Sequence, residues 1–142
     1  MILDIVQTII NYSGNLADQL CCMQIDSHLY NNIYIYQLDA HFGHDMYHIT
    51  QNVINQKKFC ELKYLNCNGN SHIKNVNHLA KTLEILYCGY IEDKMSGIDQ
   101  KGISELEKIK VLNCSLNNKI TDVNHLSKTL VSLSGQPCTC MC

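Results

Sequence analysis

The sequence predicts an α/β fold in which a small helical unit precedes a short solenoid of about four parallel strands. Two observations carry this prediction. The stretch that begins at Leu62 returns at Ile109, an offset of 47 residues, with matching Asn, His, Lys and Thr positions. Each 47-residue unit also divides into segments of 21 and 26 residues that open with the same apolar pattern. Repetition at such periods is typical of stacked repeats.

The repeated motif has apolar residues at its first, fourth and sixth positions and Asn at its ninth. In the first copy these are Leu62, Leu65, Cys67 and Asn70. The Asn amide is expected to satisfy backbone groups in the turn that leaves each strand. The segment that leads back from each strand to the next has apolar residues at about every third position, a spacing that fits tight 3₁₀ turns. Strands are expected near residues 63–67, 84–88, 110–114 and 131–134.

The segments around the repeats are expected to divide the chain into four parts. Residues 1–35 show apolar residues at helical spacing in three short stretches. Residues 36–58 are expected to form a connecting helix, residues 59–137 the repeats, and residues 138–142 a cysteine-rich tail. The longer return, around residues 92–97, is expected to bulge from the convex side or its edge.

Composition narrows the class of partner. The length of 142 residues suits one domain, and all 11 basic residues are Lys, which argues against a nucleic-acid reader. No segment has the length and apolarity of a membrane span, and the amino end lacks a basic start, so neither a membrane partner nor a signal peptide is expected. Cysteines at core positions of the motif indicate buried thiols in a reducing compartment, so we expect a cytosolic or nuclear protein and favour a cytoplasmic one.

Two clusters invite a metal interpretation. In the first, two histidines, His44 and His48, are spaced one helical turn apart, as zinc ligands often are. In the second, three cysteines could supply thiolates, which suit soft metals. The clusters are His41, His44 and His48, and Cys138, Cys140 and Cys142. We favour a polar helix face for the first and an incomplete last repeat for the second, so no metal or other cofactor is expected. The repeated His78 and His125 are expected to be structural or surface residues, because they recur with the repeat.

Nothing in the sequence marks an enzyme. The nucleophile elbow, the phosphate-binding loop and the dinucleotide fingerprint are absent, which leaves recognition as the predicted function. The side chains between the core positions of each strand should face a partner protein, and they are nearly uncharged and include Tyr, which recurs at interfaces. The candidate target-binding residues are Tyr64, Asn66, Asn68, Ile85, Tyr87, Val111, Asn113 and Ser115.

The pattern L-x-x-L-x-[L/C]-x-x-N resembles the leucine-rich repeat. Residues 1–35 resemble an F-box, through the run Ile2-Leu3-Asp4-Ile5-Val6 and the stretch from Asp18 to Tyr30, although the early Pro and the closing Trp of that pattern are absent. The layout is similar to that of F-box/leucine-rich-repeat proteins, in particular the short Asn-rich members encoded by giant DNA viruses of amoebae.

This resemblance implies a substrate-recognition subunit of a cullin-type ubiquitin ligase, in the host cytoplasm if the protein is viral. The repeats would bind a target protein and the F-box would dock on the adaptor subunit. The implied adaptor-binding residues are Ile2, Leu3, Ile5, Ile9, Leu20 and Met23. The alternative is a repeat-only binding module whose amino-terminal helices cap the solenoid. A carboxyl-terminal end without a cap should leave a strand edge partly open to self-association.

Overall fold

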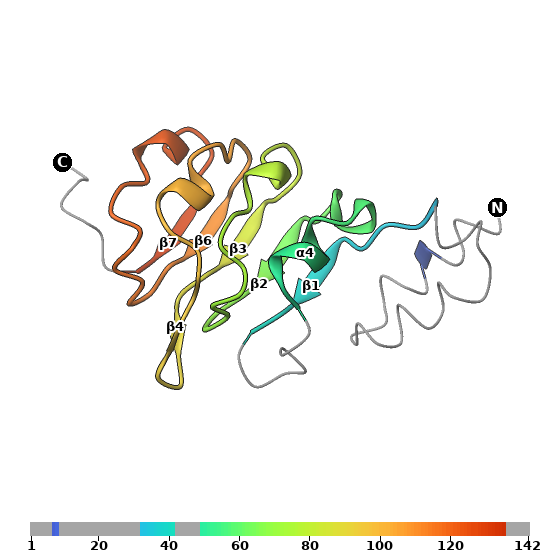
Figure 1. The fold of residues 1–142 in the computed structure, drawn as a ribbon. Coiled ribbons are helices and arrows are strands. Elements are labelled where there is room, and N and C mark those ends of the chain that lie inside the picture. Colours follow the sequence, from blue (N-terminus) through green and yellow to red (C-terminus); the bar gives the residue numbers. More distant parts are fainter. Residues whose placement is uncertain (1–6, 9–31, 42–48, 136–142) are drawn as a thin grey trace.

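The computed structural model describes residues 7–8, 32–41 and 49–135. Its central feature is a parallel sheet of five strands in the order β1-β2-β3-β6-β7 (Figure 1). The strands are β1 (Gln37–Asp39), β2 (Tyr64–Asn66), β3 (Ile85–Tyr87), β6 (Val111–Asn113) and β7 (Ser132–Ser134). The four predicted strands are confirmed, and β1 is an additional one. The fold is therefore mixed α/β, and it is compatible with a short repeat solenoid.

Each strand opens one turn of the stack, which we call a coil. The coils alternate in length between long and short. Coils 1 to 4 comprise residues 35–61, 62–82, 83–108 and 109–129, and β7 opens coil 5. The central leucines of neighbouring strands are paired in register, from Leu38 in β1 to Leu133 in β7. The sheet register therefore places equivalent residues of successive coils side by side.

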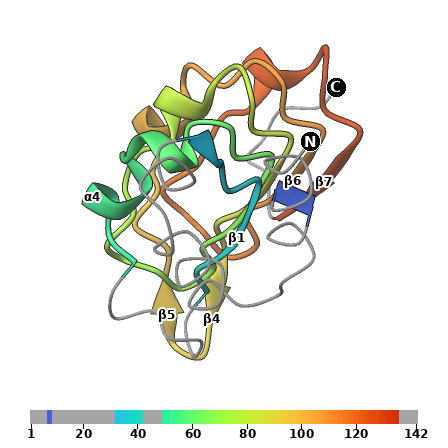
Figure 2. The ribbon, with the colours of Figure 1, turned by 90° about the vertical axis from the view of Figure 1, so that its right-hand side faces the viewer.

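Short helices lead the chain back from each strand to the next. They are α4 (Gln51–Ile54), η2 (Lys57–Phe59), η3 (Asn77–Leu79), η4 (Lys101–Ile103) and η5 (Asn124–Leu126). In Figure 2, α4 lies across the stack from β6 and β7. The predicted 3₁₀ returns are thus confirmed for coils 2 to 4. The last apolar residue of each return helix, such as Leu79 and Leu126, is buried against the core.

The segment 36–58 differs from the connecting helix that we expected. It contains β1, α4 and η2, and it forms most of coil 1. Ile35, Leu38 and Ala40 are buried at the places that Leu62, Leu65 and Cys67 take in coil 2. The physical reason is that the edge of β2 has backbone groups that need partners. At its start, the N–H groups of Lys63 and Tyr64 donate to the Tyr36 carbonyl at 2.8 and 3.1 Å. A strand there satisfies groups that a helix would leave unpaired.

A hairpin made by β4 (Tyr90–Ile91) and β5 (Lys94–Met95) accounts for the extra length of coil 3. Figure 1 shows that it projects from one edge of the stack, as the longer return predicts. Its turn residues Glu92 and Asp93 have φ values of 46° and 60°. The Tyr90 hydroxyl donates to the Asp93 carboxylate at 2.8 Å, which helps to hold this left-handed turn.

Buried asparagines connect the coils. The Nδ2 group of Asn70 donates to the carbonyls of Ala40 and Ile49 in coil 1, both at 3.1 Å, and its Oδ1 accepts the His72 N–H at 2.9 Å. Asn117 repeats this arrangement two coils later, with its Nδ2 on the Cys88 and Ile98 carbonyls at 2.8 and 3.0 Å. The predicted role of the motif Asn is therefore confirmed, and its amide also joins one coil to the next.

We predict that Asn70→Ala lowers the free energy of unfolding by about 3 kcal/mol or more, because three backbone groups lose their partner. Urea denaturation followed by circular dichroism measures this change. Asn118→Ala is the control. Asn118 is an exposed Asn directly after Asn117, the counterpart of Asn70 in coil 4, and its replacement should change stability by less than about 0.5 kcal/mol. Equal effects of the two substitutions would contradict the role of the buried amide.

The sixth position of the motif carries a row of thiols in the core. Cys67, Cys88 and Cys114 are buried, and burial raises the pKa of the Cys67 thiol to about 12 and that of Cys88 well above its ordinary value. The Cys67 thiol also contacts the Tyr87 carbonyl, with Sγ and O 3.2 Å apart. Because the thiolate is the nucleophile, these cysteines should be inert in the folded protein.

Pulsed alkylation with iodoacetamide, read by peptide mass spectrometry, tests this expectation. Cys60 is half-buried and should react in the native protein, whereas Cys67, Cys88 and Cys114 should react only in denaturant. Native labelling of Cys88 at the rate of Cys60 would show that the thiol row is not in the core.

The edge strand β7 ends the described sheet. Val131, directly before it, keeps 83% of its surface exposed, and Leu133 is only partly buried. Pairing is seen on one side of β7 only, with β6. Self-association through this end stays a prediction.

Candidate binding face

The outward side chains of the strands form one surface, which we call the open sheet face. They alternate with the buried leucines, as period-two strands require. The strand residues on this face are Gln37, Asp39, Tyr64, Asn66, Ile85, Tyr87, Val111, Asn113, Ser132 and Ser134. Asn68 and Ser115 follow their strands and are half-buried. The structure thus brings together the residues that the sequence analysis selected as target-binding.

Two tyrosines form the aromatic centre of this face. The Tyr64 and Tyr87 rings have centroids 5.7 Å apart and planes at 78°, an edge-to-face pair. Both are partly exposed on neighbouring strands. Burial, together with the charge of Asp39, raises the pKa of the Tyr64 phenol, so it stays protonated and can donate a hydrogen bond. The pair offers a partner both apolar area and a hydroxyl donor.

The β1 end of the face was missed by the sequence analysis. Asp39 lies there, opposite Asn66, and the His41 ring pairs with its carboxylate through Nδ1 and Oδ1. The signal was present in the sequence. Ile35, Leu38 and Ala40 have the same spacing as the first, fourth and sixth positions of the motif.

The asparagines of the face also have structural roles. Asn66 and Asn113 each accept the N–H group two residues on, from Asn68 at 3.3 Å and Ser115 at 3.0 Å. Asn68 Oδ1 accepts the Gly89 N–H of the next coil at 2.7 Å. A side chain at Gly89 would place its Cβ 2.7 Å from the Ser115 carbonyl oxygen, so the coils approach too closely there for any other residue. These amides therefore hold the turns that border the face.

Charged side chains gather near the amino ends of the strands. Lys110 pairs with Glu84 of the preceding coil at 2.6 Å and holds the pKa of that carboxyl below its usual value. Lys63 lies over the Tyr36 ring, with Nζ 5.7 Å from the centroid. Both lysines are exposed, so these contacts add little to stability.

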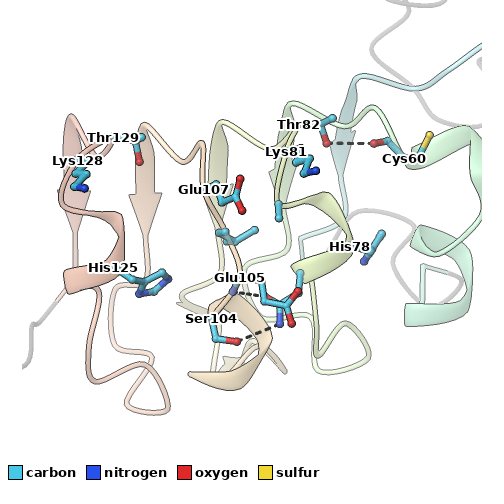
Figure 3. A pocket seen from close by; sticks show the side chains of 13 residues that line it. Cys60, His78, Lys81, Thr82, Ser104, Glu105, Glu107, His125, Lys128 and Thr129 are labelled. Atoms are coloured by element: carbon cyan, nitrogen blue, oxygen red, sulfur yellow. Dashed lines mark hydrogen bonds between the residues drawn. The ribbon is translucent and has the colours of Figure 1, made fainter.

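A groove of 790 Å³ lies over the return helices (Figure 3). His78 and His125 line it in equivalent positions of coils 2 and 4, and Glu105 comes from coil 3 between them. Each histidine Nε2 bonds a carbonyl of the preceding coil, Ile54 at 3.2 Å and Ile103 at 3.0 Å. The repeated histidines therefore have the structural role that we expected.

The environment of His78 predicts that the stability of the protein depends on pH. Burial lowers the pKa of His78 from its ordinary 6.5, although the bond to Ile54 opposes this. Between the two pKa values the unfolded chain therefore binds more protons at His78 than the folded chain does. The contribution of His78 to stability is fully present above pH 6.5 and falls as the pH drops towards the pKa of His78 in the folded protein. His78→Gln keeps a donor but does not titrate. It should lose less stability than the wild type between pH 7.5 and 5.5 in urea melts, and an equal or larger loss would contradict the assignment.

The proposed adaptor-binding residues and most of the metal candidates lie outside the described residues. The former are Ile2, Leu3, Ile5, Ile9, Leu20 and Met23, and the latter are His44, His48, Cys138, Cys140 and Cys142. Within the described part, no three His, Cys, Asp or Glu side chains are grouped closely enough to hold a metal ion. In the same part, no helix has the length and apolarity needed to cross a membrane.

In the described part of the amino-terminal segment, two hydrogen bonds tie Gln7 to Tyr34, the residue directly before coil 1. The Gln7 side chain donates to the Tyr34 carbonyl at 2.8 Å and accepts the Tyr34 N–H at 3.0 Å. This pair of bonds anchors the described part of the segment to the chain that enters β1.

Comparisons of the chain with protein-family models, with curated proteins and with solved structures gave no match.

Proposed function

We propose that this chain is a protein-recognition subunit in which leucine-rich repeats bind a target through the open sheet face. The observation that carries this proposal is the character of that face. It joins a tyrosine pair, two aliphatic side chains and several amides, with Asp39 as the one formally charged side chain among the outward residues of the five strands. Such a surface suits a protein partner, because Tyr supplies a large contact area at low entropy cost.

We further propose that residues 1–35 act as an F-box and deliver the target to a cullin-type ubiquitin ligase. The support for this role is the likeness of the run Ile2-Leu3-Asp4-Ile5-Val6 and of residues 18–30 to the F-box pattern. Coil 1 packs beside Leu62 through Ile35 and Leu38, so coil 1 and not the amino-terminal segment covers the Leu62 layer. The protein would do no chemistry itself and would raise the target concentration near the ligase.

The second candidate is a binding module with no ligase role. The Gln7–Tyr34 bonds favour it, because they tie Gln7 of the amino-terminal segment to the residue directly before coil 1. In that case the apolar residues of the segment pack on the protein itself. The two candidates share the open sheet face and differ only at the amino end.

Capture of the full chain by a purified F-box adaptor subunit separates the two. We expect wild-type binding and a loss of roughly thirtyfold or more in the double variant Ile5→Asp with Ile9→Asp, because a charge replaces an interface anchor at each site. Thr8→Asp is the control for an added charge, since it puts one carboxylate into the same segment at an exposed position.

Binding that survives the double variant would contradict docking through these residues. Absence of binding by a chain with native circular dichroism would overturn the ligase role and leave the repeat-only module. Reduced thermal stability of the double variant, without adaptor binding by the wild type, would identify the segment as a cap.

A further inference from the structure

The charges around the open sheet face are unevenly distributed. The lysines that border it lie at the amino ends of the strands, where Lys110 faces Glu84 and Lys63 faces Tyr36. At the carboxyl end of β1 lies Asp39, with 44% of its side chain exposed. Within the five strands no outward residue is a lysine. A positively charged group of a partner would therefore meet attraction at the β1 end of the face.

We propose that Asp39 and the Tyr64–Tyr87 pair bind an arginine or lysine side chain of the partner protein. This inference rests on the proposed protein-binding function and gives the chemical class of the segment that the face accepts.

The sheet register places the three groups within reach of one side chain. Asp39 lies opposite Asn66, and Asn66 lies opposite Tyr87, so these residues form a row across β1, β2 and β3. Neighbouring strands are about 4.8 Å apart, and the row therefore spans about 10 Å. The Tyr64 ring comes from the adjacent row and meets Tyr87 edge to face. Tyr64 is diagonal to Asp39 across the β1–β2 pair, so a guanidinium bound to the carboxylate can reach the Tyr64 ring, while the stem of that side chain crosses Asn66 towards Tyr87.

The chemistry of these groups favours a cation. Aromatic faces carry negative potential and attract guanidinium and ammonium groups. The chain itself shows such a contact, with Lys63 over Tyr36. The field of Asp39 reaches the Tyr64 phenol and adds to the negative potential there.

The existing partner of Asp39 does not use all of its hydrogen-bonding capacity. The His41 ring and the His41 backbone N–H both approach the same oxygen, Oδ1. A carboxylate has about four acceptor sites on its two oxygens, so a second donor can be accommodated. Arginine suits the site better than lysine, because its planar fork can bond a carboxylate and stack on a ring at once.

An NMR titration with ¹⁵N-labelled full chain tests the inference. The probes are acetylated, amidated pentapeptides that carry one Arg, one Glu or one Gln between alanines, each at millimolar concentration. The Arg peptide should shift the resonances of Asp39, Asn66 and Tyr87, and the Glu peptide should not. Asp39→Asn should weaken Arg-peptide binding by about threefold, the effect of losing one exposed ion pair. Glu107→Gln, in the groove over the return helices, is the control and should leave binding unchanged.

The outcomes separate this inference from the proposed function. Equal binding of all three peptides on the face would overturn the cation preference and leave protein binding in place. No shift with the Arg peptide, or unchanged binding by Asp39→Asn, would also overturn it. The adaptor experiment tests the other end of the chain, so its failure would leave the result of this titration unaffected.

Discussion

The buried amides of Asn70 and Asn117 are the interaction on which the rest of the structure depends. Where a coil turns away from its strand, backbone groups leave the sheet ladder and enter the core, and an unpaired buried carbonyl is costly. Each Asn amide satisfies two carbonyls of the preceding coil and one N–H of its own turn. Together with the strand pairing of the sheet, these bonds hold coil 2 to coil 1 and coil 4 to coil 3.

The long and the short coils make different side-chain hydrogen bonds to their neighbours. Long coils reach forward: Gln51 accepts two N–H groups of coil 2 and donates to the Asn75 carbonyl, and Gln100 does the same for coil 4. Short coils reach backward through Asn70, Asn117 and the two histidines, and coil 2 also reaches forward, where Asn77 bonds Lys101 and Glu105 of coil 3. In coil 3, which lacks the motif Asn, Ser96 accepts the Ile98 N–H instead.

Much of this arrangement could be predicted from the sequence, because the 47-residue offset places the same side chains in the same environments. Four strands and eight of the face residues followed from it. Coil 1 was not predicted, because it has Ala40 where coils 2 to 4 have Cys, and Gly43 at the ninth position, where coils 2 and 4 have Asn. The remaining signals in the sequence were the spacing of Ile35, Leu38 and Ala40 and the presence of a Gln in both long coils, Gln51 and Gln100. The roles of Asp39 and His41 depend on β1 and could not be seen without it.

The central claim is that buried side-chain amides hold the coils together and so shape the binding face. Hydrogen exchange of the Asn side-chain NH₂ groups, followed by NMR, tests it most directly. The account predicts slow exchange for Asn70 and Asn117, whose Nδ2 groups are buried and doubly bonded, and immediate exchange for the exposed Asn118. Exchange of all three at the same fast rate would contradict the account, because the amides would then be in contact with water and could not join the coils.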